Sequence, residues 1–67
     1  MTKFIILKNG DAINPLMVCS ICRNMSNVIV GLLNGAHHRV DMPSAEEAKA
    51  EAAAILQAVE NANKENW

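Results

Sequence analysis

The chain has almost no aromatic side chains, since its 67 residues include one Phe, one Trp and no Tyr. Apolar residues still make up 51% of the chain, but many of them are alanines, which bury little surface. A chain of this length forms one hydrophobic core and buries only about 60% of the surface that its unfolded form exposes. We therefore expect a single domain over residues 1–67 that gains stability as a homo-oligomer.

The chain also lacks a concentration of charge and a long apolar run. Its six basic and seven acidic residues are spread along the sequence and leave a net charge of −1. Nucleic-acid binding needs a basic stripe, and a membrane span needs about 20 apolar residues. Two cysteines do not make a disulfide scaffold, and the N-terminal residues do not form a signal peptide. We expect a cytoplasmic protein that binds neither nucleic acid nor membranes.

Two of the three glycines follow an asparagine, in Asn9-Gly10 and Asn34-Gly35. Asn-Gly between apolar segments is typical of a two-residue hairpin turn. The sequence therefore predicts hairpins over residues 3–14 and 28–42. With two-residue turns, Ile6 faces Ile13 and Ile29 faces Val40.

This register decides which residues of the second hairpin form the core, because alternate residues of a strand point to opposite faces. The better core face is Ile29, Gly31, Leu33, Ala36, His38 and Val40. The other face has Val28, Val30 and Leu32 beside His37, Arg39 and Asp41. We expect another subunit to cover Val28, Val30 and Leu32. A three-residue turn would instead exchange the faces of one strand.

Residues 15–27 fit two structures. Asn14-Pro15 resembles a helix N-cap followed by a favoured first helical residue, whereas residues 16–23 alternate loosely, as in a strand. The run is short for a stable helix, which favours a strand or a single irregular turn.

The last third of the chain predicts a helix over residues 44–62, with Ser44 as N-cap and Glu47 completing a capping box. One stripe of apolar residues follows at helical spacing: Ala45, Ala48, Ala52, Ile55, Leu56, Val59 and Ala62. Residues 63–67 should fray. The predicted fold class is α+β: a small antiparallel sheet of two hairpins (ββ-ββ-α, three to four strands) packed by this amphipathic helix.

Ala50, Ala53, Ala54 and Ala58 lie mainly off the apolar stripe, where small side chains allow another helix to approach. Alanine is also the best helix former, which explains them without a partner. Trp67, the C-terminal residue, has no role in the predicted fold, so we assign it with Ala50 and Ala54 to an oligomer interface.

Cys19-Ser20-Ile21-Cys22 is a CxxC motif, and such a pair supplies two thiolates to zinc. His37 or His38 would be the third ligand, and Asp41 or a partner would supply the fourth. A closed set of four Cys or His ligands is missing, and cysteines also serve as small buried hydrophobic residues. We expect no metal and no cofactor, and a small zinc protein is the second alternative.

His37 and Arg39 share one face of a strand, where they could contact a phosphate or a carboxylate. Arg23 or Lys8 would complete such an anion site. The competing interpretation is that these polar side chains are simply solvated or lie between subunits.

The segment from Leu7 to Pro15, followed by residues 28–30, 33–35 and Val40, resembles small flagellar FlbD-type proteins. Those share an early "NG…IN" element, a valine strand, a second glycine hairpin and a short acidic tail. The likeness covers residues 3–42 and implies a structural or regulatory accessory protein. Residues 19–22 and the alanine-rich helix depart from that pattern, so no functional residue is carried over.

The sequence offers no catalytic triad, paired carboxylates or phosphate-binding glycine loop, so we expect no enzyme. In size and character the chain is also similar to small phage-encoded proteins that block host defences. Our leading hypothesis is a non-enzymatic, oligomeric inhibitor or sequestering protein. Its ligand would be a host protein, or a nucleotide-like anion held between subunits.

Overall fold

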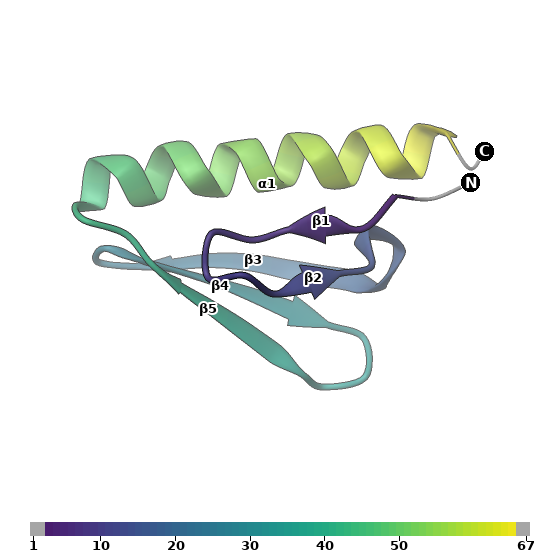
Figure 1. The fold of residues 1–67 in the computed structure, drawn as a ribbon, viewed down its shortest axis with the longest axis horizontal. Helices are drawn as coiled ribbons and strands as arrows, with labels where there is room; N and C mark the ends of the chain where they lie inside the picture. The colour runs from purple at the N-terminus through teal and green to yellow at the C-terminus, as the bar shows by residue number, and fades with distance from the viewer. Residues whose placement is uncertain (1–2, 66–67) are drawn as a thin grey trace.

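A computed structural model describes residues 3–65 (Figure 1). Its elements follow one another as β1 (Ile5–Ile6), β2 (Ala12–Ile13), a 3-10 helix η1 (Pro15–Met17), β3 (Val18–Asn24), β4 (Asn27–Leu32), β5 (His37–Asp41) and α1 (Ala45–Glu65). The predicted α+β class is confirmed. The strands form two antiparallel sheets, a β1–β2 ribbon and a three-stranded β3–β4–β5 sheet.

The three-stranded sheet is covered on one face, which we call the inner face. Helix α1 packs along β3, β4 and η1, while the β1–β2 hairpin lies beside the helix in Figure 1. Residues from all three parts meet in one core: Leu7, Ile13, Val28, Val30, Val40, Ala48, Ile55 and Val59. The core is therefore a single layer of side chains between the sheet and its cover.

The turn between β4 and β5 has three residues, not the two that the Asn-Gly pattern predicts. The Leu32 amide donates to the Ala36 carbonyl at 2.9 Å, and Gly35 has a φ of +89°. A three-residue turn that ends in a left-handed glycine is the next most common hairpin connection. Val28 consequently pairs with Val40 and Ile29 with Arg39, so the predicted pairing of Ile29 with Val40 is wrong.

This shift of one residue corrects the assignment of faces in the second hairpin. Val28 and Val30 are fully buried, and Leu32 packs partly against the same core. The predicted subunit interface at Val28, Val30 and Leu32 is therefore wrong, because the core of one chain already covers these side chains. The outer face instead has mostly small or polar residues: Ser20, Cys22, Asn24, Asn27, Ile29, Gly31, His37, Arg39 and Asp41.

The first hairpin also has a three-residue turn where the sequence predicts two residues. The Leu7 amide donates to the Asp11 carbonyl at 2.8 Å, which leaves a three-residue turn with Gly10 at a φ of +93°. Ile5 pairs with Ile13 and Ile6 with Ala12. The predicted Ile6–Ile13 pair is wrong, and Ile6 is exposed.

Both interpretations of residues 15–27 hold in part. The Asn14 side chain caps η1 by accepting from the Leu16 amide at 3.0 Å, and Pro15 opens this single turn. The chain then extends as β3, and a two-residue turn at Met25 and Ser26 leads into β4. The segment therefore contributes a third strand to the sheet instead of linking two hairpins.

Helix α1 begins as the capping pattern predicts, since the Glu47 amide donates to Ser44 Oγ at 3.2 Å. It continues to Glu65, beyond the predicted end at residue 62. The Asn63 side chain donates to the Val59 carbonyl at 2.9 Å in this last part. Trp67, proposed for the interface, lies outside the described residues. No helix in the described range is long and apolar enough to cross a membrane.

The observed register makes a direct prediction for stability. Val30→Ala should lower the free energy of unfolding by about 2 kcal/mol, because it removes buried methyl groups and leaves a cavity. Ile29→Ala, on the outer face of the same strand, should cost less than half as much. Urea denaturation of both variants measures this, and a larger loss at Ile29 would contradict the register.

Candidate functional site: a groove between β3 and α1

A groove with a volume of about 430 Å³ runs between β3 and α1. Within residues 3–65, β4 is the only strand that pairs with β3, so β3 is an edge strand. Helix α1 packs along it. The lining residues are Val18, Cys19, Ser20, Ile21, Arg23, Lys49, Ala52, Ala53, Leu56 and Val59. We call this feature the β3–α1 groove.

The edge of β3 carries free backbone hydrogen-bonding groups. The Leu32 amide donates to the Ala36 carbonyl, just before β5, and the Leu33 amide donates to the Met17 carbonyl, just before β3. The backbone groups of even-numbered β4 residues therefore face β5, and those of odd-numbered residues face β3. Paired residues alternate between bonded and unbonded positions in an antiparallel ladder. Ile21 and Arg23, which pair with Val30 and Val28, therefore direct their N–H and C=O groups away from the sheet.

A β-bulge limits the regular part of this edge. Val18 pairs with Leu32 and Ser20 with Gly31, so Cys19 is an extra residue on β3. An extra residue bends its strand and locally disrupts the ladder. The edge that another strand could pair with is consequently restricted to residues 20–24.

The charges of the groove have one sign. Its lining includes Arg23 and Lys49 but no Asp or Glu. Neither cation has an ion-pair partner among the residues whose side chains the structure describes. The remaining lining is mostly apolar, and Leu56 is 49% exposed there. The groove thus combines an apolar wall with two unpaired positive charges.

The four residues predicted to bind an anion do not come together. His37 and Arg39 share the outer face of β5, as predicted, while Arg23 belongs to the β3–α1 groove. Lys8 lies in the turn of the first hairpin. The predicted set is therefore divided among three surfaces.

Arg39 is also engaged within its own strand. Its Nε donates to Asp41 Oδ1 at 2.9 Å, and Nη2 approaches Oδ2 at 3.4 Å. These hydrogen bonds, together with the charge of Asp41, raise the pKa of the Arg39 guanidinium. An incoming anion would have to compete with Asp41 for this side chain.

The two cysteines are free and exposed. Cys22 lies on the outer face of the sheet, and Cys19 lies at the bulge beside the groove. Among the described residues, no group of three or more His, Cys, Asp or Glu side chains is placed to hold a metal ion. His37, the proposed third ligand, lies on β5, two strands away from the cysteines.

The helix residues proposed for an interface are exposed. Ala50 and Ala54 both face solvent, but neither lines the groove. Ala53, also noted off the stripe, does line it. Lys49, which lines it too, was not predicted as a site residue, and Leu56 was assigned to the core stripe. The signal was present in the spacing: Lys49, Ala53 and Leu56 follow one another at intervals of four and three residues, which places them on one side of a helix.

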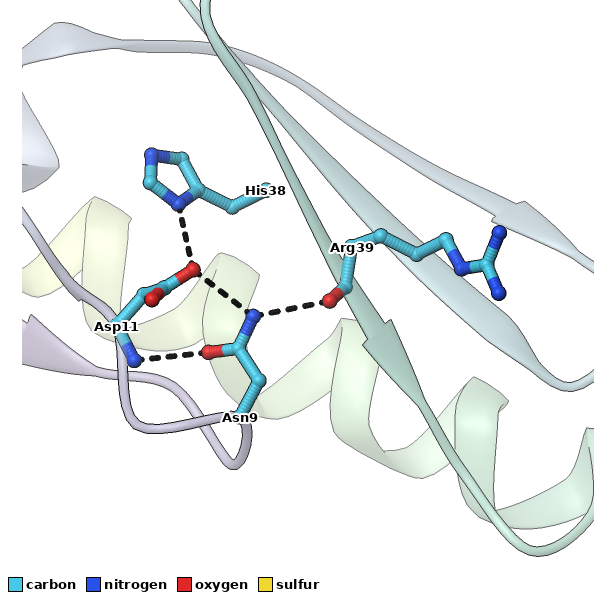
Figure 2. A network of polar contacts seen from close by, with 4 residues as sticks. All are labelled: Asn9, Asp11, His38 and Arg39. Carbon is cyan, nitrogen blue, oxygen red and sulfur yellow. Dashed lines mark hydrogen bonds and ion pairs between the residues drawn. The ribbon is translucent and has the colours of Figure 1, made fainter.

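A polar cluster joins the first hairpin to β5 (Figure 2). Asp11 Oδ2 accepts from His38 Nδ1 at 2.9 Å and from Asn9 Nδ2 at 3.0 Å. Asn9 Nδ2 also donates to the Arg39 carbonyl at 2.9 Å, whereas Figure 2 shows the Arg39 guanidinium pointing away. The hydrogen bond with His38 is the main cause that lowers the pKa of Asp11. We call the cluster of Asn9, Asp11, His38 and the Arg39 carbonyl the hairpin latch.

No protein-family model matches the chain, and neither does any curated protein or solved structure. The resemblance to FlbD-type proteins therefore remains an expectation from the sequence.

The hairpin latch predicts an acid-sensitive step in stability. Since the folded pKa of Asp11 lies below its ordinary value of about 3.9, the ionised carboxylate stabilises the fold above that pH. The contribution is lost as the pH falls through the folded pKa. Asp11→Asn should reduce the dependence of stability on pH between about pH 5 and pH 2, as measured by urea unfolding. An unchanged dependence would show that Asp11 does not stabilise the fold.

Proposed function

We propose that this protein is a non-enzymatic binding module that acts as an inhibitor or sequestering protein, with the β3–α1 groove as its contact surface. One observation carries the proposal: among the described side chains, the groove joins an apolar lining to two unpaired cations and has no carboxylate in that lining. This combination favours a ligand with an apolar body and an anionic group.

The size of the groove suits such a ligand. Its volume of about 430 Å³ lies within the range of about 300–1,000 Å³ that is usual for ligand pockets. Arg23 and Lys49 would bind the anionic group, and Leu56 with its apolar neighbours would bury the body. Arg23 also connects this site with the anion-binding role that the sequence suggested for it.

The free edge of β3 adds a second mode of recognition. An extended segment of a protein can pair with an exposed strand edge through backbone hydrogen bonds, while its alternate side chains enter pockets beside the strand. Ile21 and Arg23 offer such backbone groups next to the groove. A ligand in the form of an acidic and apolar protein segment would use both features.

A binding role agrees better with the described side chains than catalysis does. The one ion pair that involves a histidine, His38 with Asp11, holds the hairpin latch. Neither residue lines the groove. Cys19 does line it, but the histidine that would activate a thiol is not part of that lining. The groove therefore offers binding contacts without an assembled nucleophile and base.

Anilinonaphthalene sulfonate, an apolar fluorescent dye with one negative charge, tests the proposed chemistry. We expect dilute protein to bind it, and Lys49→Gln or Arg23→Gln to weaken binding by about threefold each, because each removes an exposed ion pair. Lys8→Gln removes the same charge outside the groove and should leave the affinity unchanged. Equal affinities in all three variants, with folding verified by circular dichroism, would refute the groove as an anion-binding surface.

A further inference from the structure

We propose that a second copy of this chain occupies the β3–α1 groove, so that the protein is a two-fold symmetric dimer. This inference rests on the proposed function, since it names the partner of the same groove. The two β3 edges would pair in antiparallel orientation and join two three-stranded sheets into one continuous sheet. The two α1 helices would then lie side by side on the same face of that sheet.

The side of α1 next to the groove is complementary to itself. Lys49, Ala53, Leu56 and Glu60 are separated by four, three and four residues, so they form one row along the helix. All four side chains are exposed. When two such rows run antiparallel about a two-fold axis, Lys49 faces the partner's Glu60 and Ala53 faces the partner's Leu56. Opposite charges then face each other, and a small apolar side chain faces a large one. Because of the two-fold symmetry, each of these contacts occurs twice in the dimer.

The unpaired charge of Lys49 gains a partner in this arrangement. Within one chain Lys49 lines the groove without an ion pair among the described side chains. Glu60 likewise has no ion pair among them. The large side chain of Leu56, half exposed in one chain, would be covered by the partner's Ala53. Charge complementarity is therefore the feature that selects a second copy over another occupant.

The strand and the helix place the two-fold axis at compatible points. The helical row from Lys49 to Glu60 is about 17 Å long, and strand β3 is about 20 Å long. The row and the strand therefore have similar lengths. Ile21 lies next to Cys22, the centre of the pairable edge, and it lines the groove together with Ala53 and Leu56, which flank the centre of the helical row. One axis perpendicular to the sheet can therefore pass near both centres.

The backbone groups at the edge fit this axis. Ile21 and Arg23 direct their N–H and C=O groups outward, and pairing within residues 20–24 is centred on Cys22, which brings Ile21 beside the partner's Arg23. The bulge at Cys19 and the turn after Asn24 limit the paired segment. A short segment with fixed ends allows few alternative registers, which favours a defined dimer over open-ended association.

Charge exchange on the helix tests the proposal. Lys49→Glu and Glu60→Lys should each weaken dimerisation of the full chain by about tenfold, because two attractive contacts become repulsive. A mixture of the two variants should form heterodimers in which both contacts are attractive again. Native mass spectrometry and sedimentation equilibrium report these species directly. Lys8→Glu makes the same charge change away from the groove and should dimerise as the unmodified protein does.

Hydrogen exchange tests the strand pairing without a substitution. The amides of Ile21 and Arg23 should exchange more slowly as the protein concentration rises. The amide of Asp41 on β5, at the opposite edge of the sheet, should not change. The proposal would be overturned if the protein were monomeric at hundreds of micromolar. It would also be overturned if the charge changes at residues 49 and 60 altered neither the dimer dissociation constant nor the formation of heterodimers.

The two proposals fail in different ways. If dilute protein binds the dye through Lys49 and Arg23 but remains monomeric when concentrated, the groove is a binding surface and its partner is not a second copy. If the protein dimerises as described, dye binding per chain should fall with rising protein concentration, because the dye and the second chain compete for the groove. Dye binding that is independent of dimerisation would contradict a shared site.

Discussion

The register between β4 and β5 is the constraint on which the rest of the structure depends. It is fixed by a three-residue turn in which Gly35 adopts a positive φ. In this register Val28 and Val30 point to the same side as Val40, and those three side chains are the centre of the core. A two-residue turn would direct the valines of β4 away from Val40, and α1 would have no continuous apolar surface to pack on.

The hairpin latch gives the first hairpin its place in this arrangement. A two-stranded ribbon of this length is not stable by itself in water, so its position depends on contacts with the sheet. Leu7 and Ile13 supply buried apolar surface, while Asn9 and Asp11 form hydrogen bonds with β5. Helix and hairpin together cover the inner face, and the β3 side of the helix remains open as the groove.

The sequence was most informative where a local signal decides the structure by itself. Ser44 and Glu47 set the start of α1, and Asn14 with Pro15 set η1, because capping depends on neighbouring residues only. The Asn-Gly dipeptides located both hairpins correctly. They did not determine whether each turn has two or three residues, since glycine permits both. That single ambiguity reversed the faces of the second hairpin and with them the predicted subunit interface.

The candidate site was harder to predict because it depends on tertiary contacts. Arg23 and Lys49 are 26 positions apart in the sequence, and only the packing of α1 along β3 brings them to one groove. His37 and Arg39 share a strand face, as alternation requires, but the sequence does not reveal that Asp41 engages Arg39. Leu56 matches the spacing of the core stripe, but it lines the groove and is 49% exposed.

The outer face of the sheet and the side of α1 differ in what they offer a partner. The outer face has mostly small and polar side chains, and Ser20 and His37 lie against Gly31 there, so little apolar surface is left to bury. The groove side has an exposed leucine, a free strand edge and charges of opposite sign at the two ends of one helical row. A chain with so small a core gains most from covering the side where apolar surface and backbone groups are both unsatisfied. For this fold, that side is the one between β3 and α1.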